Sequence, residues 1–310
     1  MPARTRTRRA RVAVGAACLA WFGAAAIAGQ SLPLYKATNS KPALLPIDSG
    51  ASPYTGIGRY EGRTRCTAFL LATALPRQEH LNEAPAYALT SARCVASPGP
   101  EDVLVDQPGT GSITFNYFVD ARHQVVTVPV SKIAYATMKG RDLAVLELSV
   151  LYRELVRQLI RPWPVPFTQR MVKDDQLVVV SASRAEDPKE DFLRLSTCKW
   201  EGMVPSVLEG AWRVFDMQYN ECRISAAGSA GAPVLSVIDR NAVGMIVTTT
   251  MEAGGLPKCA LGHPCEPDDG GGSRSRGKTN YATSLAGIGT CFDDRRRFNL
   301  NNPGCPLKQS

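Results

Sequence analysis

Short runs of hydrophobic and β-branched residues recur along most of the chain, each bounded by Gly, Pro, Asp or Asn. In the first half, the predicted strands cover residues 66–71, 87–94, 112–118, 125–134 and 142–148. In the second half, they cover residues 176–182, 193–200, 214–219, 232–237, 242–250 and 281–285. The pattern predicts an all-β protein with about six strands in each half, as in two β-barrels packed together.

Two segments interrupt the strands. Val150, Leu151, Leu155 and Leu159 are spaced as on one face of a helix, and a proline ends the run at position 162. We therefore expect a short connecting helix within residues 150–165. Residues 254–279 are instead rich in Gly, Pro and charged residues, a composition that predicts a long, mobile loop in the second half.

The N-terminus differs in composition from the rest of the chain. Residues 1–11 hold five arginines and no acidic residue, and an apolar run follows to Ala28. This order is typical of a secretory signal peptide, here residues 1–28. Because the uncharged stretch is also long enough to cross a bilayer, an uncleaved inner-membrane anchor is the alternative. Residues 29–54 show no sustained periodicity and are expected to form a linker or a surface arm.

Charge and cysteine content narrow the function class. Without the five arginines of the leader, the 36 basic residues fall to 31 against 28 acidic ones, a net charge near +3 instead of +8. This balance does not support nucleic-acid binding. Of the nine cysteines, Cys18 lies in the leader, and the remaining eight predict four disulfides formed in an oxidising compartment. We therefore expect an exported protein, periplasmic or extracellular, that contacts a membrane only if the leader is retained.

Two motifs resemble the catalytic corners of chymotrypsin-like serine proteases. Residues 88–94 read Ala-Leu-Thr-Ser-Ala-Arg-Cys where the family has Leu-Thr-Ala-Ala-His-Cys, so Arg93 stands at the position of the general base. Residues 228–233 read Gly-Ser-Ala-Gly-Ala-Pro, which is similar to the nucleophile turn Gly-x-Ser-Gly-x-Pro. Ala230 therefore stands at the position of the nucleophile. Asp142 is the only triad position that keeps the residue type of the family.

The resemblance covers roughly residues 55–288 and is nearest to the secreted bacterial branch that includes trypsin-like peptidases and glutamyl endopeptidases. It implies an all-β, double six-stranded β-barrel with a short helix between the barrels. The implied segments are a first barrel at 55–149, a connecting helix at 150–165, a second barrel at 166–290 with the loop at 254–279, and a C-terminal tail at 291–310 closed by a disulfide.

Spacing alone does not fix the disulfide connectivity. The resemblance pairs Cys66 with Cys94, which bracket the first motif. The remaining cysteines then pair as local loops: Cys198 with Cys222, Cys259 with Cys265, and Cys291 with Cys305.

The two replacements remove the chemistry of the triad. A guanidinium stays protonated and has no acceptor, so Arg93 cannot act as a general base, and the methyl group of Ala230 cannot attack a carbonyl. Because the triad acts as a unit, we expect a non-catalytic homologue. The alternative is an active hydrolase that uses Ser229, one residue before the nucleophile position, with a displaced base. The candidates for that base are His80, His123 and His263.

Other parts of the site do not need the lost side chains. If Arg93 reaches Asp142, the two can form a partly buried bidentate ion pair. The backbone N–H groups of Gly228 and Ala230 correspond to the oxyanion hole.

The strand Thr248, Thr249 and Thr250 corresponds to the edge on which the family lays its substrate, so a peptide could pair there. The expected partner is an unknown protein or peptide, bound in this groove or on a surface elsewhere, and no cofactor is expected.

The loop at 254–279 holds the remaining candidate residues. Cys259, His263 and Cys265 lie close together, but in an exported loop a disulfide is expected in place of a metal site. Asp268 and Asp269 lack the spaced oxygen ligands of a calcium site. A cluster of three basic residues could engage an acidic partner: Arg274, Arg276 and Lys278.

Overall fold

The computed structural model describes residues 42–47, 53–73, 83–96, 98–183 and 191–309. The leader predicted at 1–28, most of the predicted arm at 29–54, and His80 lie outside these residues. In the part of the chain that the structure describes, no helix is long and apolar enough to cross a membrane.

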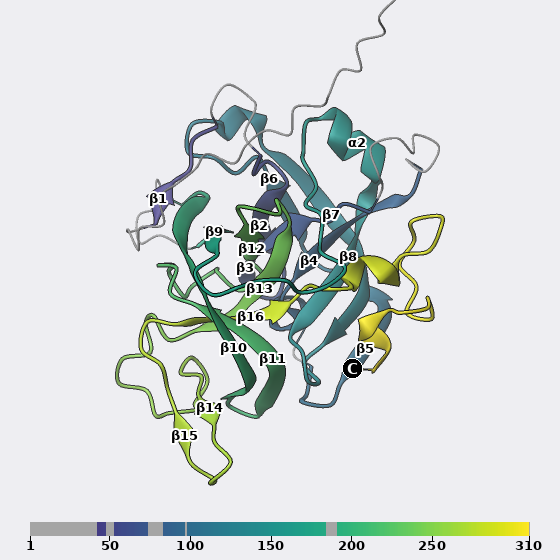
Figure 1. The fold of residues 1–310 in the computed structure, drawn as a ribbon. Helices are drawn as coiled ribbons and strands as arrows, with labels where there is room; N and C mark the ends of the chain where they lie inside the picture. The colour runs from purple at the N-terminus through teal and green to yellow at the C-terminus, as the bar shows by residue number, and fades with distance from the viewer. Residues whose placement is uncertain (1–41, 48–52, 74–82, 97, 184–190, 310) are drawn as a thin grey trace, which may run out of the picture. The chain divides into compact units, whose positions relative to one another are not determined.

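The first sheet closes on itself as a six-stranded barrel (Figure 1). The ring runs in the order β7-β6-β2-β3-β4-β8, and β8 pairs again with β7. A further strand, β5 (Val103–Pro108), pairs with β7 outside the ring. The ring strands are β2 (Ile57–Glu61), β3 (Arg65–Leu70), β4 (Pro85–Thr90), β6 (Ser112–Phe115), β7 (Val126–Thr137) and β8 (Leu143–Leu151).

The second sheet closes in the same way. Its ring runs β10-β11-β16-β13-β12-β9, and β9 pairs again with β10. The ring strands are β9 (Gln176–Ser181), β10 (Arg194–Glu209), β11 (Trp212–Asn220), β12 (Pro233–Ser236), β13 (Ala242–Thr249) and β16 (Asn280–Ser284). A short strand, β1 (Ala43–Leu44), pairs with β10 outside the ring. The predicted double six-stranded β-barrel is thus confirmed.

The two barrels share a hydrophobic core. One buried cluster joins Phe69 and Leu89 of the first barrel to Val180 and Met245 of the second. The C-terminal segment packs into the same cluster, where the ring of Phe292 meets that of Tyr87 edge-on at a centroid distance of 5.1 Å. Two short 3-10 helices belong to this segment, η4 (Ile288–Cys291) and η5 (Pro306–Gln309), and a third, η2 (Arg122–Gln124), precedes β7. The barrels are therefore held together by side chains from both halves and from the tail.

The connecting helix is shorter than the run of apolar residues from which it was predicted, and it packs on the first barrel. Helix α2 (Tyr152–Arg157) follows β8 directly. Tyr152 and Leu155 enter the core of the first barrel, with relative exposures of 6% and 0%. The apolar residues at its N-terminal end, Val150 and Leu151, belong to β8.

The sequence prediction missed β2 and the second half of β10, and each of these segments contains a glycine. A side chain at Gly58 in β2 would come within 2.5 Å of the carbonyl oxygen of Thr114, so only glycine permits this close approach of β6. In β10, Gly202 has a φ of 150° and lies at a β-bulge. The bulge lets the strand continue to Glu209, whereas the sequence predicted its end at residue 200. The exposed strand β5 was also not predicted.

The structure contains the four disulfides that the sequence analysis paired: Cys66–Cys94, Cys198–Cys222, Cys259–Cys265 and Cys291–Cys305. The first joins β3 to the turn that carries Arg93, and the second joins β10 to the segment after β11. Four disulfides fit an exported protein.

Candidate functional site

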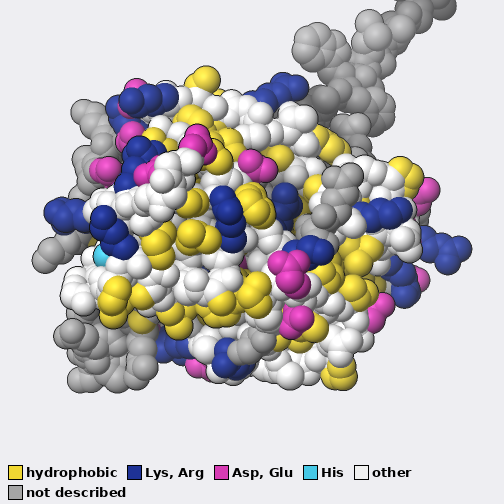
Figure 2. Space-filling model, turned by 90° about the horizontal axis from the view of Figure 1, so that it is seen from below, with side chains coloured by type: hydrophobic (Ala, Val, Ile, Leu, Met, Phe, Trp, Pro, Cys, Tyr) yellow, Lys and Arg dark blue, Asp and Glu magenta, His cyan; other side chains and the backbone are white. Residues whose placement is uncertain are grey.

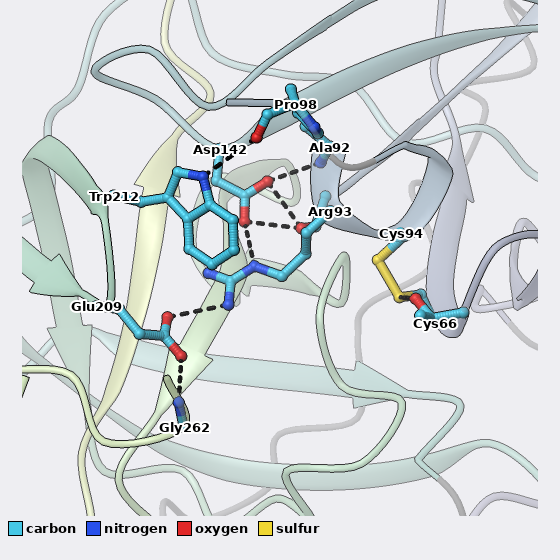
Figure 3. Close-up of polar contacts among 11 residues, drawn as sticks. Cys66, Ala92, Arg93, Cys94, Pro98, Asp142, Glu209, Trp212 and Gly262 are labelled. Carbon is cyan, nitrogen blue, oxygen red and sulfur yellow. Dashed lines mark hydrogen bonds and ion pairs between the residues drawn. A yellow bond between two sulfur atoms is a disulfide. The ribbon is translucent and has the colours of Figure 1, made fainter. Parts of the chain in front are cut away.

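A single helical turn positions Arg93. The strand predicted at residues 87–94 ends at Thr90, and α1 (Ala92–Val95) begins after an extended Ser91. The N–H of Cys94 donates to the carbonyl oxygen of Ser91 at 3.1 Å, and the disulfide to Cys66 fixes the turn against β3. Because both ends of the turn are held, the side chain of Arg93 leaves the first barrel in a defined direction (Figure 3).

Asp142 receives Arg93 in a buried site. Its side chain has no exposed surface, and it lies directly before β8. The Nε of Arg93 donates to Asp142 Oδ2 at 2.9 Å. The hydroxyl of Ser91 donates to the same carboxylate at 2.7 Å, and so does the N–H of Ala92. The Arg93–Asp142 pair expected from the sequence is therefore formed, but it is not bidentate: only Nε reaches Asp142, because Nη1 is directed to a different carboxylate. The Asp142 carboxylate accepts from three donors in all.

A second carboxylate, which the sequence analysis missed, completes the site. Glu209 ends β10 in the second barrel, and its Oε2 accepts from Arg93 Nη1 at 2.9 Å. Its other oxygen accepts from the N–H of Gly262 in the loop at 254–279, at 2.8 Å. The indole of Trp212 lies 5.7 Å from the guanidinium carbon and donates to the carbonyl oxygen of Pro98 at 3.2 Å. Arg93 thus bridges the two barrels (Figure 3).

The electrostatics keep Arg93 charged. Burial lowers the pKa of its guanidinium, but Asp142 and Glu209 outweigh this effect and raise the pKa above its ordinary value. A permanently protonated guanidinium, here bonded to carboxylates through Nε and Nη1, offers no lone pair to a substrate proton. Arg93, the side chain predicted at the base position, is therefore a cross-link between the barrels.

The turn at residues 228–233, which resembles the nucleophile turn in sequence, packs against β3 of the first barrel. The N–H of Thr67 in β3 donates to the carbonyl oxygen of Ala230 at 2.9 Å, and its hydroxyl donates to that of Gly228 at 2.8 Å. Gly231 has a φ of +87°, and a side chain there would meet the carbonyl oxygen of Thr67 at 2.0 Å. The turn keeps the tight glycine geometry of a catalytic corner, although the residue at its tip is an alanine.

Two backbone donors of the turn are free in the described structure. Within the described chain, the N–H groups of Gly228 and Ala230 donate no hydrogen bond. Gly228 takes a left-handed φ of +83°. Free backbone donors in such a turn can hold an anion or a carbonyl oxygen.

No hydrogen bond joins the hydroxyl of Ser229 to a base among the described residues. Its side chain is 2% exposed, and its hydroxyl donates to the carbonyl oxygen of Ala226 at 3.0 Å. His263 is hydrogen-bonded to the carbonyl oxygen of Leu256 through Nδ1, and His123 lies beside Gln124 in η2. A serine without an acceptor for its proton is a poor nucleophile.

Arg93 and Ala230 line one cleft, which has a volume of about 450 Å³. Thr248 and Thr249 line it too, whereas Thr250 does not, because its N–H and hydroxyl bond to the backbone of the loop at residues 276–279. The other lining residues include Arg63, Arg65, Glu209, Trp212, Ser229, Glu252, Leu256, Leu261 and Gly262. The structure therefore brings the two replaced triad positions and the predicted peptide edge together.

One edge of β13 in this cleft has no strand partner. Thr248 and Thr249 pair with β16 at Tyr281 and Asn280. On the other side, β12 pairs with β13 only as far as Met245, and the N–H of Gly231 takes the carbonyl oxygen of Ile246. In the described residues no strand lies beyond that point, so backbone groups are available for an added strand.

The loop at 254–279 is built around a buried carboxylate. Its hairpin of β14 (Glu266–Pro267) and β15 (Ser273–Arg274) places Glu266 between Arg274 Nε at 2.6 Å and Arg276 Nε at 2.5 Å. The hydroxyl of Tyr281 donates to Glu266 at 2.9 Å. Two of the three basic residues that were expected to face an acidic partner are thus paired inside the loop.

The loop also shows no metal site. Cys259 and Cys265 form a disulfide, and Asp268 accepts from the backbone N–H groups of Gly270 and Gly272. Among the described residues, no group of three His, Cys, Asp or Glu side chains could hold a metal ion. On the face shown in Figure 2, basic and acidic side chains are interspersed with hydrophobic ones, which gives no support to a nucleic-acid interface there.

No protein-family model matches the sequence, and no curated protein matches it either. Solved structures do match the fold. An inactivated protease paralogue of the scabies mite is 17% identical, covers 80% of this chain and 95% of its own, and has a TM-score of 0.51.

Two bacterial proteins also match, with lower scores. The MamO protease domain of Magnetospirillum magneticum is 10% identical, covers 76% of this chain and 94% of its own, and has a TM-score of 0.46. The inactive form of the Rv3671c protease of M. tuberculosis is 13% identical, covers 78% and 93%, and has a TM-score of 0.42. Similarity at these identities concerns the fold.

Proposed function

We propose that this chain, which has the trypsin-like serine protease fold, is an exported non-catalytic protein that binds an extended peptide segment of a partner in the cleft between its barrels. The observation that carries the proposal is the state of the two replaced positions in that cleft. Arg93 is fixed by a carboxylate from each barrel, and Ala230 presents a methyl group. The site keeps the architecture of a protease and has neither its base nor its nucleophile.

Loss of catalysis is supported by geometry as well as by residue type. A small shift of Arg93 would not free the position, because Asp142 of the first barrel and Glu209 of the second both hold it. The alternative nucleophile Ser229 is buried and bonded to a backbone carbonyl. The scabies mite protein of the same fold is itself described as inactivated, so the fold is compatible with the loss.

Peptide binding is supported by what the cleft keeps. The unpaired edge of β13 provides backbone donors and acceptors, and the free N–H groups of Gly228 and Ala230 add two more donors. Leu256 and Leu261 line the same cleft with exposures of 44% and 61%, so apolar surface is available to the side chains of the peptide. Together these features suit an extended peptide with apolar side chains.

A hydrolysis assay tests the catalytic part of the proposal. We expect the purified protein to leave casein and a fluorogenic peptide library uncleaved, because no described group can generate a nucleophile. Cleavage that disappears in the Ser229→Ala variant would show that the cleft is an active site.

A binding experiment tests the cleft. Peptides selected from a random display library against the intact protein are titrated against two variants with matched exposure. Leu261→Asp places a charge in the cleft and is expected to weaken binding about tenfold. Leu159→Asp, where the leucine is also 61% exposed but lies after α2, is expected to leave affinity unchanged. Equal affinities for both variants would place the partner surface elsewhere on the fold.

Export is supported by the four disulfides and by the composition of the N-terminus. N-terminal sequencing of the protein from its native compartment is expected to begin near Gly29. A chain that begins at Met1 and stays with the membrane would indicate a retained anchor instead.

A further inference from the structure

A second cavity lies at the junction of the barrels, lined by residues that do not line the peptide cleft. Its volume is about 480 Å³. Gly140, next to Arg141, is bridged to Val214 of β11, and the N–H of Phe215 donates to the carbonyl oxygen of Gly140 at 2.9 Å. This contact joins the loop before β8 to a strand of the second barrel, so the cavity has walls from both barrels.

The lining is strongly biased toward positive charge. Three of the lining residues are basic, namely Lys139, Arg141 and Arg213, and only one is acidic, Glu101. Glu101 faces Lys139 at 3.8 Å, and both side chains are exposed, so this pair contributes little. One acid against three cations leaves the cavity with a positive potential.

Arg141 is the least compensated of the three cations. Its Nη1 is buried and has no hydrogen-bond partner, and Arg141 forms no ion pair in the described chain. Burial lowers the pKa of its guanidinium, and electrostatic interactions with Tyr135 and Asp216 offset this only in part. Buried charges in proteins are normally paired, so an unpaired guanidinium that lines a cavity lacks its counter-charge.

Arg213 and Phe215 form a fixed wall of the cavity. The Nε and Nη2 of Arg213 both donate to the hydroxyl of Ser206 at 3.2 Å. Its guanidinium carbon lies 5.4 Å from the ring centre of Phe215, which is 49% exposed. The strand thus presents a cation already oriented beside an open aromatic surface.

We infer that this cavity is a binding site for a ligand that carries an oxyanion, a carboxylate or a phosphate, beside an aromatic or apolar group. The oxyanion provides the counter-charge for Arg141, with Arg213 and Lys139 on its other sides. The apolar part packs on Phe215 and on Pro306, which also lines the cavity. This site is separate in residues from the peptide cleft and does not depend on the function proposed for that cleft.

The test uses phenyl phosphate, benzoate and inorganic phosphate as probes, each titrated into the intact protein by isothermal calorimetry. We expect saturable binding of the two aromatic anions and weaker binding of inorganic phosphate, which has no ring to pack on Phe215. The order of phenyl phosphate and benzoate distinguishes a phosphate ligand from a carboxylate ligand. Dissociation constants above about 10 mM for all three probes would overturn the proposal.

The control distinguishes a specific binding site from non-specific attraction of anions to positive charge. Arg141→Gln is expected to weaken phenyl phosphate binding at least tenfold, as for the loss of one charged donor. Arg223→Gln makes the same charge change at an exposed arginine that lines neither cavity, and it is expected to leave binding unchanged. Equal weakening by both variants would show only non-specific charge attraction. If circular dichroism shows that Arg141→Gln is unfolded, the exposed Arg213→Gln replaces it with the same expectation.

Discussion

Two arginines flank the buried carboxylate of Asp142, one bonded to it and one next to it in sequence, and they are in opposite electrostatic states. Arg93 donates to Asp142 and to Glu209, and its pKa is raised. Arg141 has no ion pair in the described chain, and its pKa is lowered. The role of a buried arginine therefore depends on which charged groups the neighbouring strands and turns place beside it. A cation with two carboxylates cross-links the barrels, and a cation without one is suited to bind an anion.

Removing the paired arginine should have the largest effect. Arg93→Met leaves two buried carboxylates without their cation and is expected to lower the free energy of unfolding by about 3–5 kcal/mol. Urea unfolding at neutral pH measures this loss, with Arg223→Met as a control at an exposed site. If the two variants lost equal stability, the inter-barrel cross-link would have no energetic role.

A second variant sharpens this prediction. Glu209→Gln removes one of the two charges and keeps an oxygen for the N–H of Gly262. Added to Arg93→Met, it is expected to restore at least about 1 kcal/mol, because only one carboxylate then remains without a cation. A further loss of stability in the double variant would contradict this account.

The hairpin of the long loop offers the inverse arrangement, one carboxylate between two arginines. Burial raises the pKa of Glu266, but hydrogen bonds from Arg276, Arg274 and Tyr281 outweigh it and hold the pKa below its ordinary value of 4.5. Stabilisation by a carboxylate of lowered pKa is present above the pKa of the unfolded chain and is lost as the pH falls through the folded value.

We therefore expect Glu266 to stabilise the protein at neutral pH and to lose this effect below about pH 4.5. Between neutral pH and pH 3, the wild type should lose about 1 kcal/mol more than Glu266→Gln, measured by urea unfolding at each pH. Parallel pH curves for the two proteins would show that the hairpin does not depend on this charge.

Removing the unpaired arginine should have the smallest effect on stability. Arg141→Met takes away a buried charge that has no partner, so the free energy of unfolding is expected to change by less than about 1 kcal/mol or to rise. The same urea unfolding experiment measures it. A loss as large as that of Arg93→Met would mean that the contrast between the two arginines is wrong.

Local pattern in the sequence was sufficient for most of the fold. The runs that became β9, β12, β13 and β16 were predicted close to their observed ends, because each is a short apolar stretch between turn residues. Two of the failures came at glycines. Gly58 and Gly202 weaken a strand pattern, and their real role, close approach in β2 and a bulge in β10, depends on the neighbouring strand.

The wrong prediction of where β10 ends also hid Glu209, one of the two carboxylates that bind Arg93. Glu209 was not recognised because the strand was predicted to end nine residues earlier, at residue 200. Its partner Arg93 is 116 residues away in the sequence. No local sequence pattern identifies two residues so far apart in the chain as partners. Only the packing of the two barrels brings the end of β10 to α1.

The sequence by itself determined what the side chains at positions 93 and 230 cannot do. Arginine at 93 has no acceptor and alanine at 230 has no hydroxyl, whatever the surrounding structure. It also determined the eight cysteines after the predicted leader and the all-β pattern. The tertiary structure decided what the replacements became, because burial and long-range pairing set the state of a charge. Packing gave Arg93 a second carboxylate and left Arg141, next to Asp142 in the sequence, without an ion pair among the described residues.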